Sequence, residues 1–466
     1  MFVARSAGRI RLARTLFVLA ALLPTCVLVA WAMHLRSPRH LAAIRRDWQR
    51  AVGLPVTLRS VSHPRPGVVR AEGVAVGSPH AAAALPLGTL EVEVVPGEWR
   101  LRLGRLRCGP VGVRLIAGLA REWLERGPRF EEDGVIEIMD FAWEPESVAS
   151  STEPKPLRIE CVRQDGARAI RIHRPAGDAL PMHSAVNHSP DNYSPDSHSA
   201  LNDVRIVRRG AVRDEQIGNG RAGKPDGDRP IIELEASWAE PLPFDILAAA
   251  MEGTPLGRWS LGPEATVVGR LHIVDGRDGG QIQAHGRLEN IDLASCAEAI
   301  GLRARGRADA IVHDFAWRAG RLVSGDLECA VGAGRVERRF LDTLVTTVGC
   351  RPGPGYAAVD AAGEAAFDAA SCRIRISSAG VSLTSGPRLG GPLAVIEGRS
   401  VVEPPLGAVP ASRLAWLVAP PDAAYVPSAG PGAWLLSIMP QEAAAADQGR
   451  GERASQADAA DRPRGF

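Results

Sequence analysis

The segments LEVEV (residues 90–94) and WRLRL (residues 99–103), separated by a Pro-Gly pair, decide the fold class. In the second segment apolar and charged residues alternate strictly. Because neighbouring side chains of a β-strand point to opposite faces, such a strand has one buried face and one face in water. The same alternation recurs at RIE (158–160), IRIH (170–173) and CRIRI (372–376). We therefore predict a mainly β protein with a few short helices.

The length and the composition set broad limits on the class of protein. A chain of 466 residues exceeds one ordinary core, so two or three domains are expected. Hydrophobic residues make up 45% and charged residues 23%, which is typical of folded proteins. The net charge of +2 provides no field for nucleic acid, and we expect no such partner. The basic residues are almost all Arg, which with abundant Ala, Gly and Pro is typical of a GC-rich bacterial genome.

An apolar segment near the N-terminus, residues 15–35, is long enough to cross a membrane as a helix. Pro24 lies in the middle of this segment and predicts a kink. Arginines flank both ends almost equally, so the short N-terminal tail without acidic residues favours a cytoplasmic N-terminus. The alternative is a cleaved signal peptide, for which Ala30-Trp31-Ala32 provides a small-x-small site. The apolar run exceeds a signal-peptide core of about 7–15 residues, which favours an uncleaved transmembrane anchor.

A second helix is expected directly after this segment. Leu41, Ile44 and Trp48 recur at helical spacing, and Gly53 ends the run. Arginines lie between these apolar residues. The helix therefore either lies on lipid headgroups or packs on the β body. Further along the chain, Asp292 is expected to cap the start of another short helix.

Composition shifts divide the chain into six expected parts. The segment 175–230 is rich in Ser, Asn, Asp, Gly and Pro, is broken only by VRIV at 204–207, and holds too little apolar surface to order itself. The parts are a cytoplasmic tail (1–14), the transmembrane anchor (15–35), an N-terminal β-rich region with a juxtamembrane helix (36–174), a polar flexible insertion (175–230), a C-terminal β-rich region (231–440) and a disordered tail (441–466).

The chemistry-bearing residues form no recognisable site. The polar stretch contains His173, His183, His188 and His198, but their spacing does not place two of them on one helix face or in a tight loop. We find no nucleophile elbow, no H-E-x-x-H and no phosphate-binding loop. We therefore expect no enzyme, with no catalytic, cofactor-binding or metal-binding residue and no cofactor.

Seven cysteines leave the thiol state open. None forms a C-x-x-C pair, which argues against zinc-ribbon and thioredoxin sites. Six lie outside the anchor, and several occupy apolar positions of strands, where a free Cys behaves as a small hydrophobic residue. They are either buried thiols or, in an oxidising compartment, include at least one disulfide.

Many two-faced strands form either a sandwich or a long curved antiparallel sheet. A curved sheet with an apolar concave face has room for acyl chains, whereas a sandwich fills its own core. The alternation of residues alone does not separate the two.

Several short segments carry a family resemblance. The anchor and juxtamembrane helix, followed by GLPVTL (53–58) and RPGVVRAEGV (65–74), resemble the start of AsmA-like envelope proteins. GRADA (306–310), DFAW (314–317) and GRL (320–322) resemble their C-terminal part. The resemblance covers residues 10–115 and 265–345. The chain departs from the family in its short length and in the insertion at 175–230.

The resemblance implies a protein anchored in the inner membrane, with most of the chain in the periplasm and with membrane lipid and other envelope proteins as partners. The leading hypothesis is a non-catalytic bacterial envelope protein that supports outer-membrane assembly or lipid transport. The alternative is an anchored periplasmic scaffold that binds another envelope protein.

Overall fold

The computed structural model describes residues 7–77, 84–126, 133–144, 154–164, 167–174, 203–209, 231–251, 260–275, 280–299, 301–358, 363–418 and 431–440. The chain divides into two compact units. The first contains Met1–Glu144 and Ser151–Val162, and the second contains Pro145–Ser150 and Arg163–Phe466. The expected tail at 441–466 and most of the expected insertion at 175–230 lie outside the described residues.

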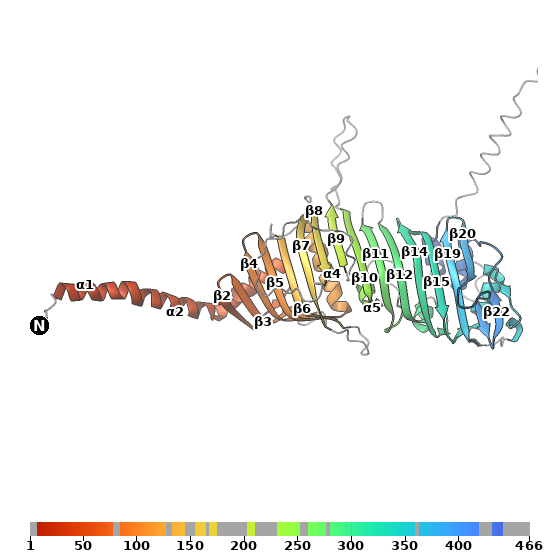
Figure 1. Ribbon diagram of the computed structural model, residues 1–466, viewed down its shortest axis with the longest axis horizontal. Helices are drawn as coiled ribbons and strands as arrows, with labels where there is room; N and C mark the ends of the chain where they lie inside the picture. Colours follow the sequence, from red (N-terminus) through yellow and green to blue (C-terminus); the bar gives the residue numbers. More distant parts are fainter. Residues whose placement is uncertain are drawn as a thin grey trace, which may run out of the picture. The chain divides into compact units, whose positions relative to one another are not determined.

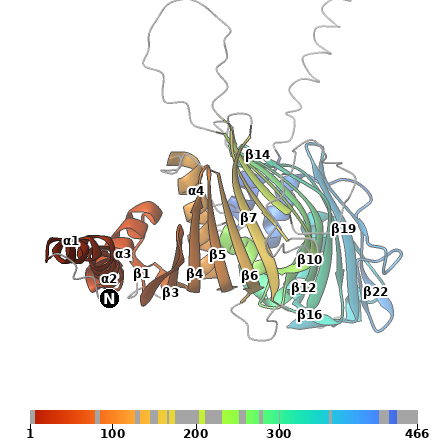
Figure 2. The ribbon, with the colours of Figure 1, turned by 60° about the vertical axis from the view of Figure 1, so that its left-hand side comes forward.

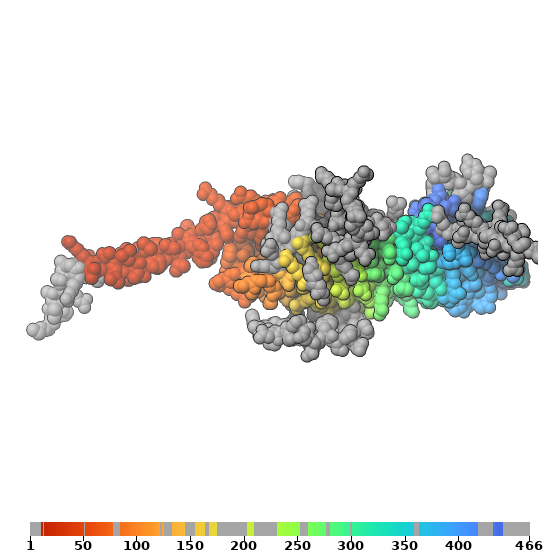
Figure 3. All heavy atoms as spheres, turned by 90° about the horizontal axis from the view of Figure 1, so that it is seen from above, coloured from red at the N-terminus to blue at the C-terminus, as the bar shows by residue number. Residues whose placement is uncertain are grey.

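The N-terminal helix consists of α1 (Ala7–Phe17), a π-helical turn (Val18–Leu22) and α2 (Leu23–Leu35). The π-helical turn lies directly before Pro24, whose missing N–H leaves a regular ladder incomplete. Residues Arg14–Leu35 span 22 residues and are long and apolar enough to cross a membrane. None of this segment is buried, and Figure 3 shows it standing clear of the sheet of its own unit.

The helix expected directly after the apolar segment is present as α3 (Pro38–Val52). The Ser37 hydroxyl accepts a hydrogen bond from the His40 amide, and Gly53 ends the helix in the left-handed conformation. The helix contacts strand β1 (Val56–Thr57), and Arg45 Nε donates to the Val56 carbonyl at 2.8 Å. The helix therefore packs on the β body through β1.

The first unit contains one sheet in the order β2–β3–β4–β5–β6–β7, with β1 also paired to β3. Its strands are β2 (Ser60–Arg65), β3 (Val68–Val76), β4 (Leu85–Val95), β5 (Glu98–Cys108), β6 (Asp133–Trp143) and β7 (Lys155–Gln164). All neighbours are antiparallel except β5 and β6. The helix α4 (Pro110–Arg126) connects these two parallel strands, as such a crossover requires.

The main sheet of the second unit is an antiparallel series, and most of its strands follow one another in chain order (Figure 1). The series is β8 (Ala167–His173), β9 (Asp203–Arg209), β10 (Ile231–Pro243), β11 (Thr266–Asp275), β12 (Gln281–Asp292), β14 (Arg307–Arg318), β15 (Arg321–Val331) and β19 (Ala369–Ser377). Beyond β19 lie β20 (Gly380–Ser385), β21 (Ala394–Ile396), β22 (Arg399–Glu403) and β17 (Arg351–Pro352). The VRIV run inside the expected insertion belongs to β9, which pairs on both sides.

Short helices and a small second sheet complete this unit. The small sheet contains β13 (Ala304–Arg305), β16 (Gly334–Glu337) and β18 (Glu364–Phe367). The helical elements are α5 (Phe244–Ala250), α6 (Leu293–Ala299), α7 (Arg338–Thr343), a π-helical turn (Leu344–Val348), two 3-10 helices (Tyr356–Ala358 and Ala411–Val418) and α8 (Pro431–Ile438). The Asp292 carboxylate accepts from the amides of Ala294 and Ser295, which confirms the expected cap of α6.

The prediction of a mainly β protein with an N-terminal apolar helix and a large antiparallel sheet is confirmed. The main sheet of the second unit is curved, as Figure 2 shows. Its core combines buried residues of β10, β11, β12, β14 and β15, including Trp238, Leu271 and Trp317, with Phe244 of α5. A second core surrounds Val348, Val401 and Val402 near the C-terminal strands.

Candidate functional site

The residues that the sequence singled out as possible ligands do not come together in the described structure. His173 lies on β8 directly opposite Asp203 of β9, whereas His183, His188 and His198 lie outside the described residues. Within the described ranges no group of three or more His, Cys, Asp or Glu side chains has the geometry to hold a metal ion. The surfaces of the two sheets are therefore the features from which a function can be argued.

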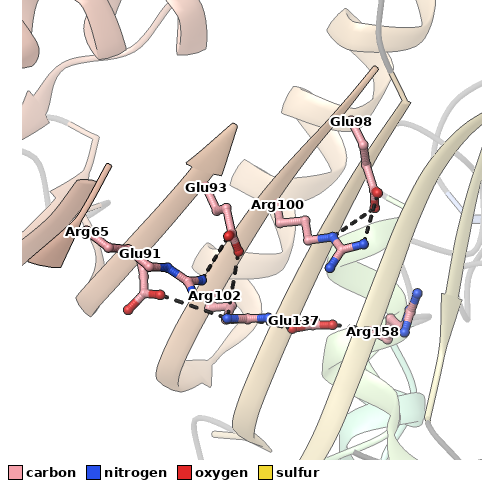
Figure 4. Close-up of polar contacts among 8 residues, drawn as sticks. All are labelled: Arg65, Glu91, Glu93, Glu98, Arg100, Arg102, Glu137 and Arg158. Carbon is pink, nitrogen blue, oxygen red and sulfur yellow. Dashed lines mark hydrogen bonds and ion pairs between the residues drawn. The ribbon is translucent and has the colours of Figure 1, made fainter. Parts of the chain in front are cut away.

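The sheet of the first unit has one charged face. Arg70, Glu91, Arg102, Glu137 and Arg158 are directly opposed across β3, β4, β5, β6 and β7, so that positive and negative residues alternate. Figure 4 shows the central part of this row, with Glu93, Arg65, Arg100 and Glu98 beside it. We call the row from Arg70 to Arg158 the charged row.

Ion pairs connect neighbouring members of the charged row. Arg102 Nε lies 2.9 Å from a Glu137 carboxylate oxygen, and its Nη1 lies 3.9 Å from Glu91 (Figure 4). Arg158 approaches Glu137 at 3.9 Å from the other side. Partly exposed pairs of this kind contribute about 0.2–1 kcal/mol each, more when several share a network. Each carboxylate is already partnered by an arginine, so this face stabilises the sheet and presents little uncompensated charge to a ligand.

The opposite face of the same sheet is apolar. One register row contains Leu90, Leu103, Ile138 and Leu157, and the next contains Val92, Leu101, Ile136 and Ile159. The first three residues of the first row are buried, whereas the second row is only half buried. Val94, two residues beyond Val92 on β4, has 61% of its surface exposed. Apolar surface therefore becomes more accessible towards the β4–β5 turn.

The second unit repeats this two-faced pattern over more strands. A row of seven opposed residues is apolar throughout, one residue from each of β8, β9, β10, β11, β12, β14 and β15: Ile170, Ile206, Leu234, Ile273, Ile282, Trp317 and Leu322. We call these residues the apolar row. The strand positions between them carry polar residues such as Arg205, Glu235 and His272 on the other face.

Burial varies along the apolar row. Ile282, Trp317 and Leu322 are buried in the core that also contains Phe244 of α5. Ile206, Leu234 and Ile273, on β9, β10 and β11, are only half buried. An antiparallel sheet that packs on a core along its whole length buries one face completely. This stretch of the apolar row therefore keeps apolar surface that another molecule can cover.

Three histidines meet where the N-terminal helix joins the first unit. The ring of His40 on α3 lies 5.5 Å from that of His34 on α2 and 5.3 Å from that of His63 on β2, centroid to centroid. Its Nε2 is buried and has no hydrogen-bond partner among the residues that the structure describes. Burial, and then the nearby charges of His63 and His34, lower the pKa of His40. The neutral imidazole is therefore the favoured form.

All seven cysteines are free thiols in the structure. Burial raises the pKa of Cys108 and of Cys161 to about 12, and that of Cys350 to about 11, so these thiols stay protonated and unreactive. Cys329 and Cys372 differ, because they are directly opposed on β15 and β19, and interaction with the Cys372 thiol lowers the pKa of Cys329.

The sequence predicted that each strand has an apolar and a charged face, but not which residues of different strands lie next to each other. The charged row, the histidine group and the cysteine pair all join residues that are distant in the chain. The alternation at 90–103 and 158–160 signalled charged faces, whereas no local signal indicated that Arg102 and Arg158 share one carboxylate.

No protein-family model matches the chain, no curated protein matches it, and no solved structure matches it.

Proposed function

We propose that this chain is a non-catalytic protein of the bacterial cell envelope that holds membrane lipid on the apolar faces of its sheets. In this proposal it is AsmA-like and supports outer-membrane assembly or lipid transport. The apolar row carries the argument, because three of its neighbouring residues remain half exposed in a folded sheet. Burying such surface against acyl chains is favourable by about 25 cal/mol per Å².

The N-terminal helix supplies the membrane attachment in this proposal. Arg14–Leu35 has the length and apolarity of a single membrane span. The short tail before it contains no acidic residue, which favours the cytoplasmic side. The protein would then be a single-pass inner-membrane protein with both β units in the periplasm, next to a supply of lipid.

Photo-crosslinking with a benzophenone amino acid tests lipid contact without interference from the anchor. The probe replaces Leu101 or Leu234 on the apolar faces, or the adjacent Arg102 or Glu235 on the polar faces, in the full chain expressed in a Gram-negative host. Each control differs from its partner by one residue on the same strand. We expect lipid adducts at the two apolar positions and none at the two polar positions, measured by mass spectrometry of the purified chain.

The same experiment separates lipid handling from the alternative function. One protein crosslinked reproducibly at Leu101 or Leu234, with no lipid adduct, would support an anchored scaffold that binds another envelope protein. Adducts of equal yield at the apolar and polar positions would reflect general proximity to a membrane and would contradict the proposal.

A further inference from the structure

Two arginines end the apolar face of the second unit at its β8–β9 side. Arg168 on β8 is directly opposed to Arg208 on β9. The next pair on the same face is Ile170 and Ile206, because side chains two residues apart on a strand share a face. Two guanidinium groups therefore adjoin Ile170, which is buried, and Ile206, which is half buried, at the β8–β9 end of the apolar row.

This arginine pair lacks the partners that such groups normally have. Like charges placed directly opposite each other destabilise a sheet. Nη1 of Arg168 and Nε of Arg208 are both buried, and within the described part of the chain neither atom has a hydrogen-bond partner. Burial, followed by the charges of Arg208 and Arg163, lowers the pKa of Arg168. An arginine nevertheless keeps its proton in proteins, so the pair retains both its charge and its unsatisfied donors.

On the opposite face of the same two strands, a second pair of opposed arginines has an acidic neighbour. Arg171 and Arg205 are also directly opposed, but Glu235 of β10 lies next to Arg205 in register. The corresponding β10 neighbour of Arg208 is Ile232. The nearest acidic residue in that register row is Asp275 on β11, two strands and about 9–10 Å from Arg208. The uncompensated pair is thus on the apolar face.

We propose that Arg168 and Arg208 bind the phosphate of an anionic phospholipid whose acyl chains lie along Ile206, Leu234 and Ile273. The planar guanidinium group matches phosphate geometry through two parallel N–H···O bonds. A phosphate at this position supplies acceptors to the unpartnered donors and cancels the repulsion between the pair. The adjoining half-buried aliphatic residues favour a lipid over a free anion. This inference rests on the proposed lipid-handling function and names its headgroup class.

Equilibrium binding of short-chain lipids to the full chain in a nonionic detergent tests the headgroup site. Phosphatidylglycerol is compared with phosphatidylcholine of the same chain length, and inorganic phosphate is measured alone. The test variant is Arg168→Gln/Arg208→Gln, and the matched control is Arg171→Gln/Arg205→Gln on the other face of the same strands. We expect the test variant to lose roughly tenfold in affinity for phosphatidylglycerol, as two charge-assisted bonds predict, with phosphatidylcholine binding unchanged. The control variant should bind both lipids like the wild type.

Four results would overturn the inference, and each can be told apart from the others. If the wild-type protein binds the two lipids with equal affinity, it does not recognise the phosphatidylglycerol headgroup. This result does not depend on whether the variant folds, and it leaves the proposed lipid-handling function in place. Retained preference for phosphatidylglycerol in the folded test variant places the headgroup elsewhere. Inorganic phosphate that binds as tightly as phosphatidylglycerol shows an anion site that does not recognise lipid. If neither lipid binds the wild-type protein, both the headgroup site and the proposed function are contradicted.

Discussion

Cys329 on β15 and Cys372 on β19 are directly opposed in an antiparallel register. Opposed residues in such strands have Cα atoms about 4.5–5.5 Å apart, within the range that a disulfide spans. Interaction with the neighbouring Cys372 thiol lowers the pKa of Cys329. This sulfur is therefore the better nucleophile of the pair.

We predict that diamide oxidises this pair selectively. Diamide accepts the two hydrogens of the thiols and becomes the hydrazine, while one disulfide joins β15 to β19. Closing the loop between the two cysteines should stabilise the second unit by on the order of 4 kcal/mol. Peptide mapping of the oxidised protein identifies the disulfide, and urea unfolding measures the gain in stability. Cys329→Ser should abolish both effects, and a disulfide that instead joins Cys108 or Cys161 would contradict the register.

The indole of Trp99 on β5 lies over Gly134 of β6. The two residues are opposed in the parallel pair, and a Cβ atom built on Gly134 would lie 1.9 Å from Cε2 of Trp99. We predict that Gly134→Ala displaces the ring and destabilises the protein by about 1–3 kcal/mol, measured by urea unfolding. In a Trp99→Val background the same substitution should cost much less, because the clash has been removed.

Gly104→Ala is the matched control for this effect. Gly104 also lies in β5, and a Cβ atom added there meets nothing within 4 Å. Its substitution should change stability by a few tenths of a kcal/mol at most, in either direction. An equal loss of stability at positions 104 and 134 would show that replacing any glycine of a strand has this effect, and that the clash with Trp99 does not cause it.

The residue pattern predicted the β-strands but not which strands pair with each other. The alternation at 99–103 predicted one buried and one exposed face for β5. The structure places Leu101 and Leu103 on the face opposite Arg100 and Arg102, but within 99–103 only Leu103 is buried. Alternation has a period of two residues and contains no information on which strand lies alongside, or in which direction. The pairing of β5 with β6 follows from the crossover through α4, and that of Arg168 with Arg208 joins strands separated by a long polar segment. The candidate binding residues were therefore beyond sequence reasoning.

Glu137 is the central carboxylate of the charged row. Its side chain, 19% exposed, lies between Arg102 and Arg158. Glu137→Gln leaves two arginines facing each other across a neutral residue, and we predict a loss of about 1 kcal/mol in the free energy of unfolding. Asp47→Asn removes the Arg50–Asp47 pair on α3, where both side chains are more than 60% exposed, and should have almost no effect. Equal effects of the two substitutions would show that the charged row gains nothing from being a network.

The histidine group predicts a stability that depends on pH. The folded-state pKa of His40 lies below its ordinary value of 6.5, because burial and the neighbouring His63 and His34 disfavour its charged form. Between these two pKa values the unfolded chain binds more protons than the folded one, so the free energy of unfolding falls as the pH falls below about 6.5. We predict that the first unit is less stable at pH 5.5 than at pH 7.5. His40→Gln, which cannot be protonated, should reduce this difference, as measured by hydrogen exchange of α3 and β2.

His272→Gln is the control for this dependence, because His272 lies in the second unit beside Glu233, at 3.1 Å. It should leave the difference between the two pH values in the first unit unchanged. Protonation of His40 places a charge between two rings at 5.3 and 5.5 Å, so exchange should accelerate first where α3 meets β2. Acceleration confined to β6 and β7, or of the same size in His40→Gln, would show that His40 does not cause the pH dependence.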